Sequence, residues 1–330
     1  MMAKRLCIAG GSGFVGRRVR DYFAALGWEI VTLSRRPAGG GLHWDGRTAG
    51  PWADALRDCD VLLNLAGRSV NCRYTAANRR AIYDSRLEST RVLGRVLRDH
   101  PGRVRVWLNA STATIYRHAE DRPQDEITGE ITRTATSDDA HPARAAVGWQ
   151  ETWAFSVDVA RQWESAFLAA GEGANSAGAG PGVRRVALRM AIVMARGAGG
   201  AFDVLDRLVR FGLGGTIAPG TQRVSFVHER DLCRAIEFLI DHDEISGPVN
   251  LVAPNVPTMR DFMGALRRVR RRPIGLPTAR WQMHVGAFFL RTEAELMLKS
   301  RWVYPKRLID AGFAFEFPDW ATTSQALTRD

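Results

Sequence analysis

The chain has 330 residues, of which 45% are hydrophobic and 25% are charged, and this ordinary globular composition excludes a disordered or fibrous protein. Basic residues outnumber acidic ones by 46 to 35, which gives a formal net charge of +11, but the arginines are dispersed and no nucleic-acid-binding module is recognisable. The length is sufficient for one doubly wound core and about one further small domain.

Membrane-targeting segments are not predicted. Residues 1–5 lead directly into an apolar strand, which leaves no room for a signal peptide. The most apolar later stretch, 281–298, contains Arg291, Glu293 and Glu295, so we do not expect it to span a membrane. The four cysteines have neither metal-binding nor disulfide-framework spacing, which favours a reducing cytoplasm and predicts no metal site.

The first half of the chain alternates short apolar runs with longer amphipathic ones, a pattern typical of β-α-β units and a parallel sheet. Strands are predicted at residues 6–9, 29–33, 61–65, 104–108 and 186–193. Helices are predicted between them at residues 17–26, 76–99 and 153–170. Residues 117–148 are polar and residues 171–182 are rich in glycine and alanine, so both predict flexible surface connections.

A glycine-rich turn, Gly10-Gly11-Ser12-Gly13-Phe14-Val15-Gly16, joins the first predicted strand to the first predicted helix. This strand–turn–helix context is the one that a dinucleotide-binding fingerprint requires. Gly10 and Gly13 allow the backbone to turn sharply and to approach a pyrophosphate, and Gly16 allows the helix to pack on the strand. The helix N-terminus offers free N–H groups and a favourable dipole to the phosphates. The alternative is a tight turn without a ligand.

The residues that end the second strand distinguish between the two nicotinamide cofactors. NAD-binding proteins place an acidic side chain there to hold the ribose 2′-hydroxyl, whereas this chain has Ser34-Arg35-Arg36 and no carboxylate nearby. Arginine holds a 2′-phosphate by paired, charge-assisted hydrogen bonds. The sequence therefore favours NADP(H) over NAD, with an unliganded surface arginine pair as the alternative.

After about residue 195 the order changes to helix, short strand, helix, with prolines between them. We therefore predict an α/β fold with a Rossmann doubly wound parallel sheet at residues 1–195 and a smaller α/β C-terminal domain at 196–330, whose elements are free to interleave. The dense arginine run at 267–272 is either a solvated helix end or a contact for a phosphate, a membrane or an acidic partner.

Several further motifs point to one family. They are Asn64-Leu65-Ala66-Gly67, Asn71–Tyr74, Asp84-Ser85-Arg86, Ala110–Tyr116, Trp163-Glu164, Gly212–Gly215, Val227–Asp231, Tyr304–Leu308 and Ala311-Gly312-Phe313. Together with the glycine turn, they make the chain resemble the extended short-chain dehydrogenase/reductases. The similarity is closer to an atypical branch, called "epimerase family" or nucleotide-sugar epimerase-like, that carries its own C-terminal domain. The resemblance covers nearly the whole chain.

The resemblance implies a role for each matching residue. The cofactor-binding residues that it implies are Gly10, Gly11, Ser12, Gly13, Phe14, Val15, Gly16, Ser34, Arg35, Arg36, Leu65, Ala66, Gly67 and Arg86. Arg86 stands where typical extended members carry a structural asparagine. Thr112 stands at the catalytic serine position, and its hydroxyl is able to hydrogen-bond a substrate oxygen.

The chain departs from the family pattern at the catalytic Tyr-x-x-x-Lys pair, in which lysine lowers the pKa of the tyrosine. None of the five tyrosines is followed by lysine four residues later, and no lysine exists between Lys4 and Lys299. The best alignment places Phe155 at the tyrosine position and Val159 at the lysine position, within several residues of uncertainty caused by the preceding polar insertion. Neither side chain carries a proton.

Three hypotheses for the function remain. In the first, the protein is an NADP(H)-dependent reductase or epimerase that acts on a carbonyl or sugar-type substrate, with Thr112 polarising a carbonyl and Tyr116 or His118 donating a proton. In the second, it is a non-catalytic NADP(H)-binding sensor or regulator. In the third, it is a scaffold whose basic surface binds a partner and whose cofactor is structural. The fold alone does not choose among them, and the protein is expected to be a monomer or a homodimer.

For a substrate, the polar groups expected nearby are Asn71, Arg73, Tyr74 and Arg189, of which either arginine could hold an anionic group. Three other features are interpreted as structural. His228 and Asp231 are expected at a strand-to-helix junction, and Trp163-Glu164 in helix packing. The aromatic residues Phe313, Phe315, Phe317 and Trp320 are expected in the C-terminal core.

Overall fold

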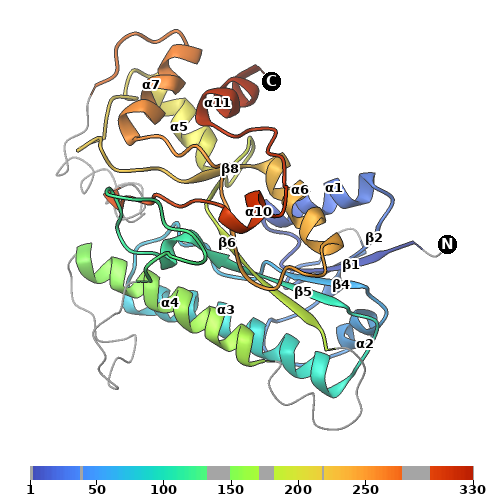
Figure 1. Cartoon of the computed structure of the whole chain (residues 1–330). Coiled ribbons are helices and arrows are strands. Elements are labelled where there is room, and N and C mark those ends of the chain that lie inside the picture. Colours follow the sequence, from blue (N-terminus) through green and yellow to red (C-terminus); the bar gives the residue numbers. More distant parts are fainter. Residues whose placement is uncertain are drawn as a thin grey trace.

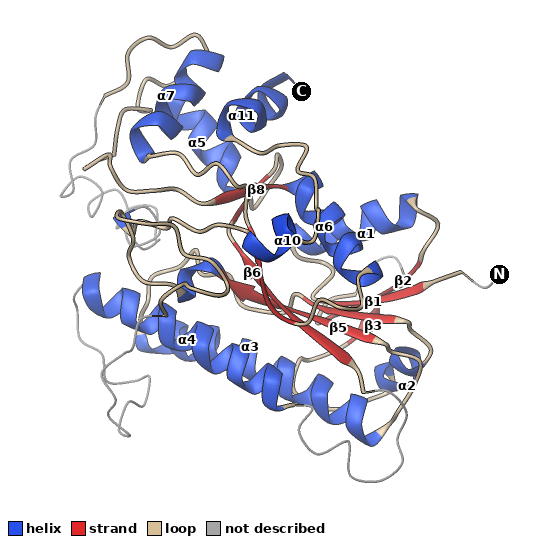
Figure 2. Cartoon of the chain, in the orientation of Figure 1, coloured by secondary structure: helices blue, strands red, loops and turns tan. Residues whose placement is uncertain are grey.

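The computed structural model describes residues 3–37, 40–131, 149–170, 182–217, 219–276 and 298–329, apart from the side chains of 149–152. Within these residues, parallel strands form a seven-stranded sheet in the order β3-β2-β1-β4-β5-β6-β9 (Figure 2). Crossovers run outward from β1 in both directions, which confirms the predicted doubly wound Rossmann sheet. The strands are β1 (Arg5–Ala9), β2 (Glu29–Ser34), β3 (Leu42–His43), β4 (Val61–Asn64), β5 (Val106–Thr112), β6 (Arg184–Met190) and β9 (Gly247–Leu251).

Helices cover both faces of this sheet (Figure 1). Successive residues of a strand point to opposite faces, so Leu6 and Ile8 of β1 enter one core while Cys7 and Ala9 enter the other. The first core is covered by α1 (Phe14–Ala25), α6 (Glu229–Asp241) and α10 (Lys306–Asp310). The second core is covered by α2 (Trp52–Arg57), α3 (Ala76–Asp99) and α4 (Trp149–Ala169).

A smaller lobe is built from segments that follow residue 190 (Figure 1). The strand β7 (Ile192–Met194) pairs in parallel with β8 (Phe226–His228). The helices of this lobe are α5 (Ala201–Arg210), α7 (Met259–Val269) and α11 (Trp320–Arg329). Their apolar faces meet in a core in which the ring of Trp320 stacks on Phe262, with 3.9 Å between the ring centroids.

The chain passes repeatedly between the two lobes. The helices α6 and α10 and the strand β9 follow residue 195, but they pack on or join the Rossmann sheet. Phe313, expected in a separate C-terminal core, lies in the Rossmann core with Leu308, whereas Trp320 lies in the core of the smaller lobe. The arginine run 267–272 ends α7, and Arg270 forms an ion pair with Asp206. At least one arginine of the run, Arg270, therefore connects the end of α7 to α5 by an ion pair.

Several element bounds differ from the prediction. The predicted strand 186–193 is two strands, because the backbone leaves the main sheet at Ala191 and β7 pairs elsewhere. The strand β5 begins at Val106 and runs to Thr112, since β6 continues to pair with it up to that residue. In the polar stretch after β5, Gln124 is fully buried, and its N–H donates to the carbonyl of Trp302 over 2.7 Å. The remaining predicted connections at 132–148 and 171–181, and most of the apolar stretch 281–298, lie outside the described residues.

Candidate cofactor-binding and active site

The glycine loop is too closely packed for side chains at two positions. Gly10 has φ +80°, and a Cβ there would lie 2.9 Å from the backbone nitrogen of Ala66. A Cβ at Gly16 would lie 2.6 Å from the Cα of Gly11. The loop therefore contacts both α1 and the segment after β4 at a distance that only glycine permits.

The N-terminus of α1 is open toward the loop. Its N-cap is Gly13, no side chain caps it, and its first turn contains no acidic residue. A Cβ at Gly13 would come near only one atom, the carbonyl oxygen of Gly10 at 3.2 Å. Free N–H groups, the positive end of the helix dipole and an unobstructed backbone make this a suitable place for a phosphate. Ser12 is exposed beside it, and Phe14 and Val15 are half-buried.

The end of β2 presents two arginines. Ser34 is buried, its hydroxyl lies 2.9 Å from that of Ser12, and it accepts a hydrogen bond from the N–H of Arg36. These contacts tie the glycine loop to the turn that carries Arg35 and Arg36, both of which are exposed. Within the described part of the chain, neither guanidinium forms an ion pair. Two arginines thus lie beside the glycine loop, where NAD-binding proteins have a carboxylate.

The loop after β4 is held by a buried amide pair. Asn64 donates from its side chain to Asn109 over 2.7 Å and accepts from the N–H of Ala66 over 3.0 Å. Leu65 donates its N–H to the carbonyl of Ala9 over 2.8 Å, so the loop continues beside the end of β1. These contacts position Leu65, Ala66 and Gly67 next to Gly10.

Arg86 of α3 contacts the same loop after β4. It donates to the carbonyls of Arg68 and Ile82, and its guanidinium lies 5.1 Å from the ring centroid of Trp163. A Cβ at Gly67 would lie 3.4 Å from the guanidinium carbon. Burial lowers the pKa of Arg86 to about 10, which leaves it charged at neutral pH. Arg86 is therefore placed to support the loop from the protein side.

Thr112 ends β5 at the same edge of the sheet. Its hydroxyl accepts from the N–H of Thr114 over 3.2 Å and so begins the short 3₁₀ helix η1 (Ala113–Ile115). The side chain is half-buried, and the hydroxyl proton remains available to an acceptor. Apart from Arg86 of α3, the predicted cofactor residues and Thr112 thus lie at or after the carboxyl ends of β1, β2, β4 and β5, where open α/β sheets bind their ligands.

Tyr116 and Arg189 belong to a buried network instead. The two carboxylate oxygens of Glu164 accept from Arg189 over 2.8 and 2.7 Å. Arg189 also donates over 2.8 Å to the Tyr116 hydroxyl, which donates in turn to Asn250 over 3.0 Å. Burial raises the pKa of Tyr116 to about 12. This geometry does not favour a proton-donor role for Tyr116 or an anion-binding role for Arg189.

The other predicted substrate residues share one loop. Asn71 and Arg73 are exposed, while Tyr74 is buried, and its ring packs edge-on against Phe155 of α4 with 5.3 Å between the centroids. This loop, residues 69–75, connects the cofactor side of β4 to the start of α3. The structure therefore brings Asn71, Arg73 and Tyr74 together and separates them from Arg189, which the Glu164 network holds.

Comparisons with known proteins identify the family. Residues 6–252 match the model of the NAD dependent epimerase/dehydratase family, and residues 285–327 match a domain of unknown function, DUF1731. The chain belongs to the NAD dependent epimerase/dehydratase family. This confirms the resemblance to extended short-chain dehydrogenase/reductases.

Relatives of this epimerase-family chain match it over nearly their full length. The epimerase family protein SDR39U1 of Bos taurus is 29% identical over 96% of both chains, and the epimerase family protein YfhF of Bacillus subtilis is 28% identical over 98% of both. Human SDR39U1, solved with NADPH, has a similar fold, with a TM-score of 0.81 at 24% identity over 99% of both chains. A UDP-N-acetylglucosamine 4-epimerase from Bacillus cereus gives a TM-score of 0.71 at 14% identity over 98% of both chains.

The family's catalytic tyrosine and lysine positions, as aligned above, carry buried apolar side chains in this epimerase-family chain. Phe155 and Val159 are 8% and 5% exposed and form a cluster with Tyr74 and Ile82 between α3 and α4. A phenylalanine and a valine at these places stabilise the packing of the two helices and carry no proton.

Sequence reasoning missed two cations that reach this epimerase-family site from the C-terminal segment. Lys299 is 3% exposed and donates to the carbonyl of Thr114 over 2.8 Å. Arg301 donates to the Thr114 hydroxyl over 3.1 Å. Both side chains therefore lie on η1, directly after Thr112. No local pattern could indicate this, because about 185 residues separate the partners along the sequence.

His118 lies beside these cations. Its Nδ1 accepts from the N–H of Ser300 over 3.2 Å, and its ring stacks on Trp153 of α4. Burial lowers the pKa of His118, and nearby Lys299, Arg117 and Arg301 lower it further, against the opposing effect of Glu120. The ring is therefore neutral at physiological pH.

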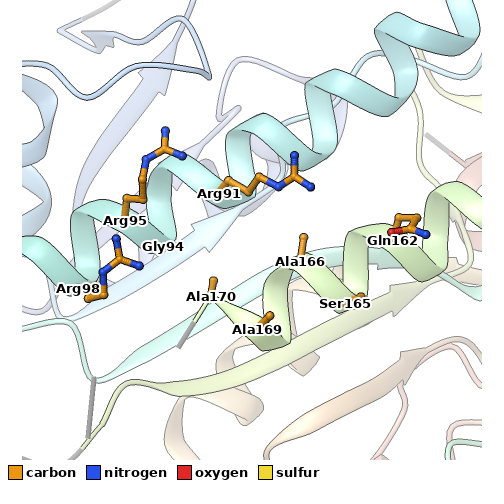
Figure 3. A pocket seen from close by; sticks show the side chains of 9 residues that line it. All are labelled: Arg91, Gly94, Arg95, Arg98, Gln162, Ser165, Ala166, Ala169 and Ala170. Atoms are coloured by element: carbon orange, nitrogen blue, oxygen red, sulfur yellow. The ribbon is translucent and has the colours of Figure 1, made fainter. Parts of the chain in front are cut away.

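A separate cavity of about 340 Å³ lies between the C-terminal parts of α3 and α4 (Figure 3). Arg91, Arg95 and Arg98 line one side of it and Ala166 and Ala169 the other. Because α3 starts after β4 and ends before β5, these arginines lie toward the edge of the sheet opposite the glycine loop. Among the described residues there is no metal-binding group of histidine, cysteine and acidic side chains, and no helix long and apolar enough to cross a membrane.

Proposed function

We propose that this chain binds NADP(H) and reduces or epimerises a carbonyl or sugar-type substrate without the usual tyrosine–lysine pair. The observation that carries the proposal is the open N-terminus of α1 beside Arg35 and Arg36. The free N–H groups of α1 would bind the pyrophosphate, and the two guanidiniums would bind the 2′-phosphate. The first turn of α1 contains no carboxylate that would repel them.

Each part of the cofactor has residues that fit it. The pyrophosphate would lie against Gly10–Gly13 and the α1 N-terminus, and the 2′-phosphate against Arg35 and Arg36. Leu65, Ala66 and Gly67 would line the adenosine side. The NADPH in the human SDR39U1 structure supports this choice of cofactor.

The residues near Thr112 suggest how a substrate would be held. When bound, NADPH supplies a hydride. The Thr112 hydroxyl would donate to a substrate carbonyl, and Lys299 and Arg301 would add positive charge behind it through η1. The remaining candidate for the proton donor is His118, which is exposed, since Tyr116 is buried and paired with Arg189 and Asn250.

A second candidate function is a sensor that binds NADP(H) without turnover. The observation in its favour is the apolar pair Phe155 and Val159, because typical members place their proton-transfer groups at these positions. NADPH consumption during a screen of carbonyl compounds and nucleotide sugars would support the enzyme. Tight NADPH binding with no consumption of it across the screen would favour the sensor.

The deciding experiment is a fluorescence titration with NADPH and NADH. We expect tighter binding of NADPH, and a loss of about 10- to 100-fold in NADPH affinity in Arg35→Ala/Arg36→Ala, because charge-assisted hydrogen bonds contribute about 1.5–3 kcal/mol each. NADH affinity should stay within about twofold.

The matched control is Arg271→Ala/Arg272→Ala, which removes two other exposed, adjacent arginines and should change neither affinity. If the wild-type chain binds neither nucleotide, both the enzyme and the sensor are excluded. If both double variants weaken NADPH equally, the effect is one of net charge rather than of recognition.

A further inference from the structure

A buried arginine in the first turns of α3 has no counter-ion in the part of the chain that the structure describes. Arg79 is 6% exposed, and its Nε donates to the carbonyl of Tyr74 over 3.0 Å. Its Nη1 is buried and makes no hydrogen bond. Among the described residues, no carboxylate lies within ion-pair distance of this guanidinium.

The surroundings of Arg79 are apolar. Its guanidinium carbon lies 5.1 Å from the ring centroid of Phe155, which forms a cluster with Tyr74, Ile82 and Val159. An aromatic face and one carbonyl compensate only part of the cost of taking a guanidinium out of water. A second buried arginine in this structure has its charge neutralised. Arg189 is 5% exposed and donates to both carboxylate oxygens of Glu164.

The position of Arg79 relates it to the proposed active site. It follows the loop of residues 69–75, which carries Asn71, Arg73 and Tyr74, and it packs on Phe155, which our best alignment places at the family's catalytic tyrosine position. The α3 and α4 helices lie side by side here (Figure 1). An anion at Arg79 would therefore lie next to the place where typical members act on their substrate.

We infer that Arg79 anchors an anion subsite that takes a carboxylate or phosphate group of the substrate. The inference rests on the proposed function and specifies its substrate class as an anionic carbonyl or sugar compound. Because Nη1 is buried, binding requires the loop of residues 69–75 to shift outward. The loop is tied to α3, because Asn78 donates to the carbonyl of Arg73 over 2.7 Å and the N–H of Arg79 donates to the carbonyl of Thr75 over 2.8 Å, so the outward shift has to break these bonds.

The test is calorimetric titration with inorganic phosphate and, separately, with acetate, at constant ionic strength. Saturating NADPH occupies the other phosphate sites that we propose. We expect saturable binding of one or both anions to the wild-type chain, a loss of at least tenfold in Arg79→Met, and a smaller loss in Arg79→Lys. The anion that binds more tightly shows whether the subsite takes a phosphate or a carboxylate group of the substrate.

The matched control is Arg80→Met, because Arg80 is the next residue, is exposed and pairs with Asp84. It should bind the anion like the wild type. Equal anion affinity in wild type and Arg79→Met, or no anion binding to the wild type, would overturn the subsite. Loss of anion binding in Arg79→Met with a melting temperature at or above that of the wild type supports the subsite, because the variant then removes an unpaired buried charge without unfolding the chain. A lower melting temperature with unchanged anion binding shows a structural role.

Failure of the proposed function is distinguishable from failure of the subsite. If the wild-type chain does not bind NADPH, the proposed function fails, and the anion titration is then repeated in the Arg35→Ala/Arg36→Ala background, which lacks the competing arginines. If the wild type, Arg79→Met and Arg80→Met bind NADPH equally and only the anion result is negative, the subsite alone fails.

Discussion

Side chains that match the family's active-site pattern differ in whether the fold leaves them free to act. Thr112 keeps a hydroxyl proton at the edge of the sheet, whereas Tyr116, four residues later, is 1% exposed and paired on both sides. Glu164, Arg189, Tyr116 and Asn250 connect α4, β6 and β9 through one line of hydrogen bonds. A buried network that is fully satisfied stabilises the arrangement of its elements.

Replacing Tyr116 by phenylalanine tests which role this hydroxyl has. We expect Tyr116→Phe to lower the free energy of unfolding by about 1–3 kcal/mol, because Arg189 and Asn250 each lose a hydrogen-bond partner in the interior. NADPH affinity should remain unchanged. Denaturant unfolding with Tyr83→Phe as the control, a half-buried tyrosine in the same half of the chain, measures the difference. Unchanged stability with abolished turnover would instead make Tyr116 the proton donor.

At the scale of elements, the junction between β8 and α6 depends on a neutral histidine. His228 caps α6 by accepting the N–H of Arg230 over 3.1 Å, and its ring stacks on Phe317. Asp231, fully buried in the first turn of α6, accepts the N–H groups of Glu316 and Phe317 over 3.0 and 2.8 Å. The two residues expected to be structural therefore attach α6 to the segment before α11.

This junction predicts a sensitivity to acid. Burial, with a smaller contribution from nearby Arg230 and against the opposing effect of Glu316, lowers the pKa of His228 to about 4. Above the ordinary histidine pKa of about 6.5, both folded and unfolded states are neutral at this site. As the pH falls from there to about 4, only the unfolded state takes up the proton, so stability falls by up to about 3 kcal/mol.

His228→Asn keeps a capping oxygen and removes the titration. Denaturant unfolding between pH 7 and pH 4.5 should therefore show a shallower loss of stability in His228→Asn than in the wild type. The difference in absolute stability also contains the lost stacking on Phe317, so the slope with pH is the quantity to compare. Equal slopes would show that His228 titrates normally in the folded state.

At the scale of the molecule, the two lobes are not separable segments of sequence. Leu308 and Phe313 from the C-terminal region complete the core that contains Leu6 and Ile8 of β1. The segment around Arg301 lies between the loop after β5 and the strand region near Ser225, whose hydroxyl donates to the carbonyl of Arg301. The Rossmann sheet, which carries the proposed cofactor site, and the C-terminal region are therefore joined by buried contacts.

A truncated chain tests this interdependence. We expect the fragment 1–252, the part that matches the epimerase family model, to lose cooperative unfolding and NADPH binding. Burial of one large apolar side chain contributes about 1.5–3 kcal/mol, and whole domains are stable by only about 5–15 kcal/mol. The milder Leu308→Ala should keep a single transition and lose about 2–5 kcal/mol. A fragment that unfolds cooperatively in calorimetry would show two independent domains.

Local patterns were sufficient to predict the features that depend on neighbouring residues. Two of these features, the glycine turn and the arginine pair after Ser34, each lie within a few residues, and the β-α-β alternation follows from local periodicity. Their backbone and hydrogen-bonding requirements can therefore be predicted from the sequence. The end of the strand at 186–193 could not be predicted in this way, because apolar residues continue from the end of β6 through Ala191 into β7, and only the pairing partners separate the two strands.

The sequence by itself therefore determined the Rossmann fold and the residues suited to a dinucleotide, because both follow from local periodicity and from the backbone freedom of glycine. Only the tertiary structure decided which polar side chains are free. It paired Arg189 with Glu164, left Arg79 without a carboxylate among the described residues, and brought Lys299 to η1 from the far end of the chain. Burial and the identity of a charge's partner depend on contacts between distant segments, and no local pattern records them.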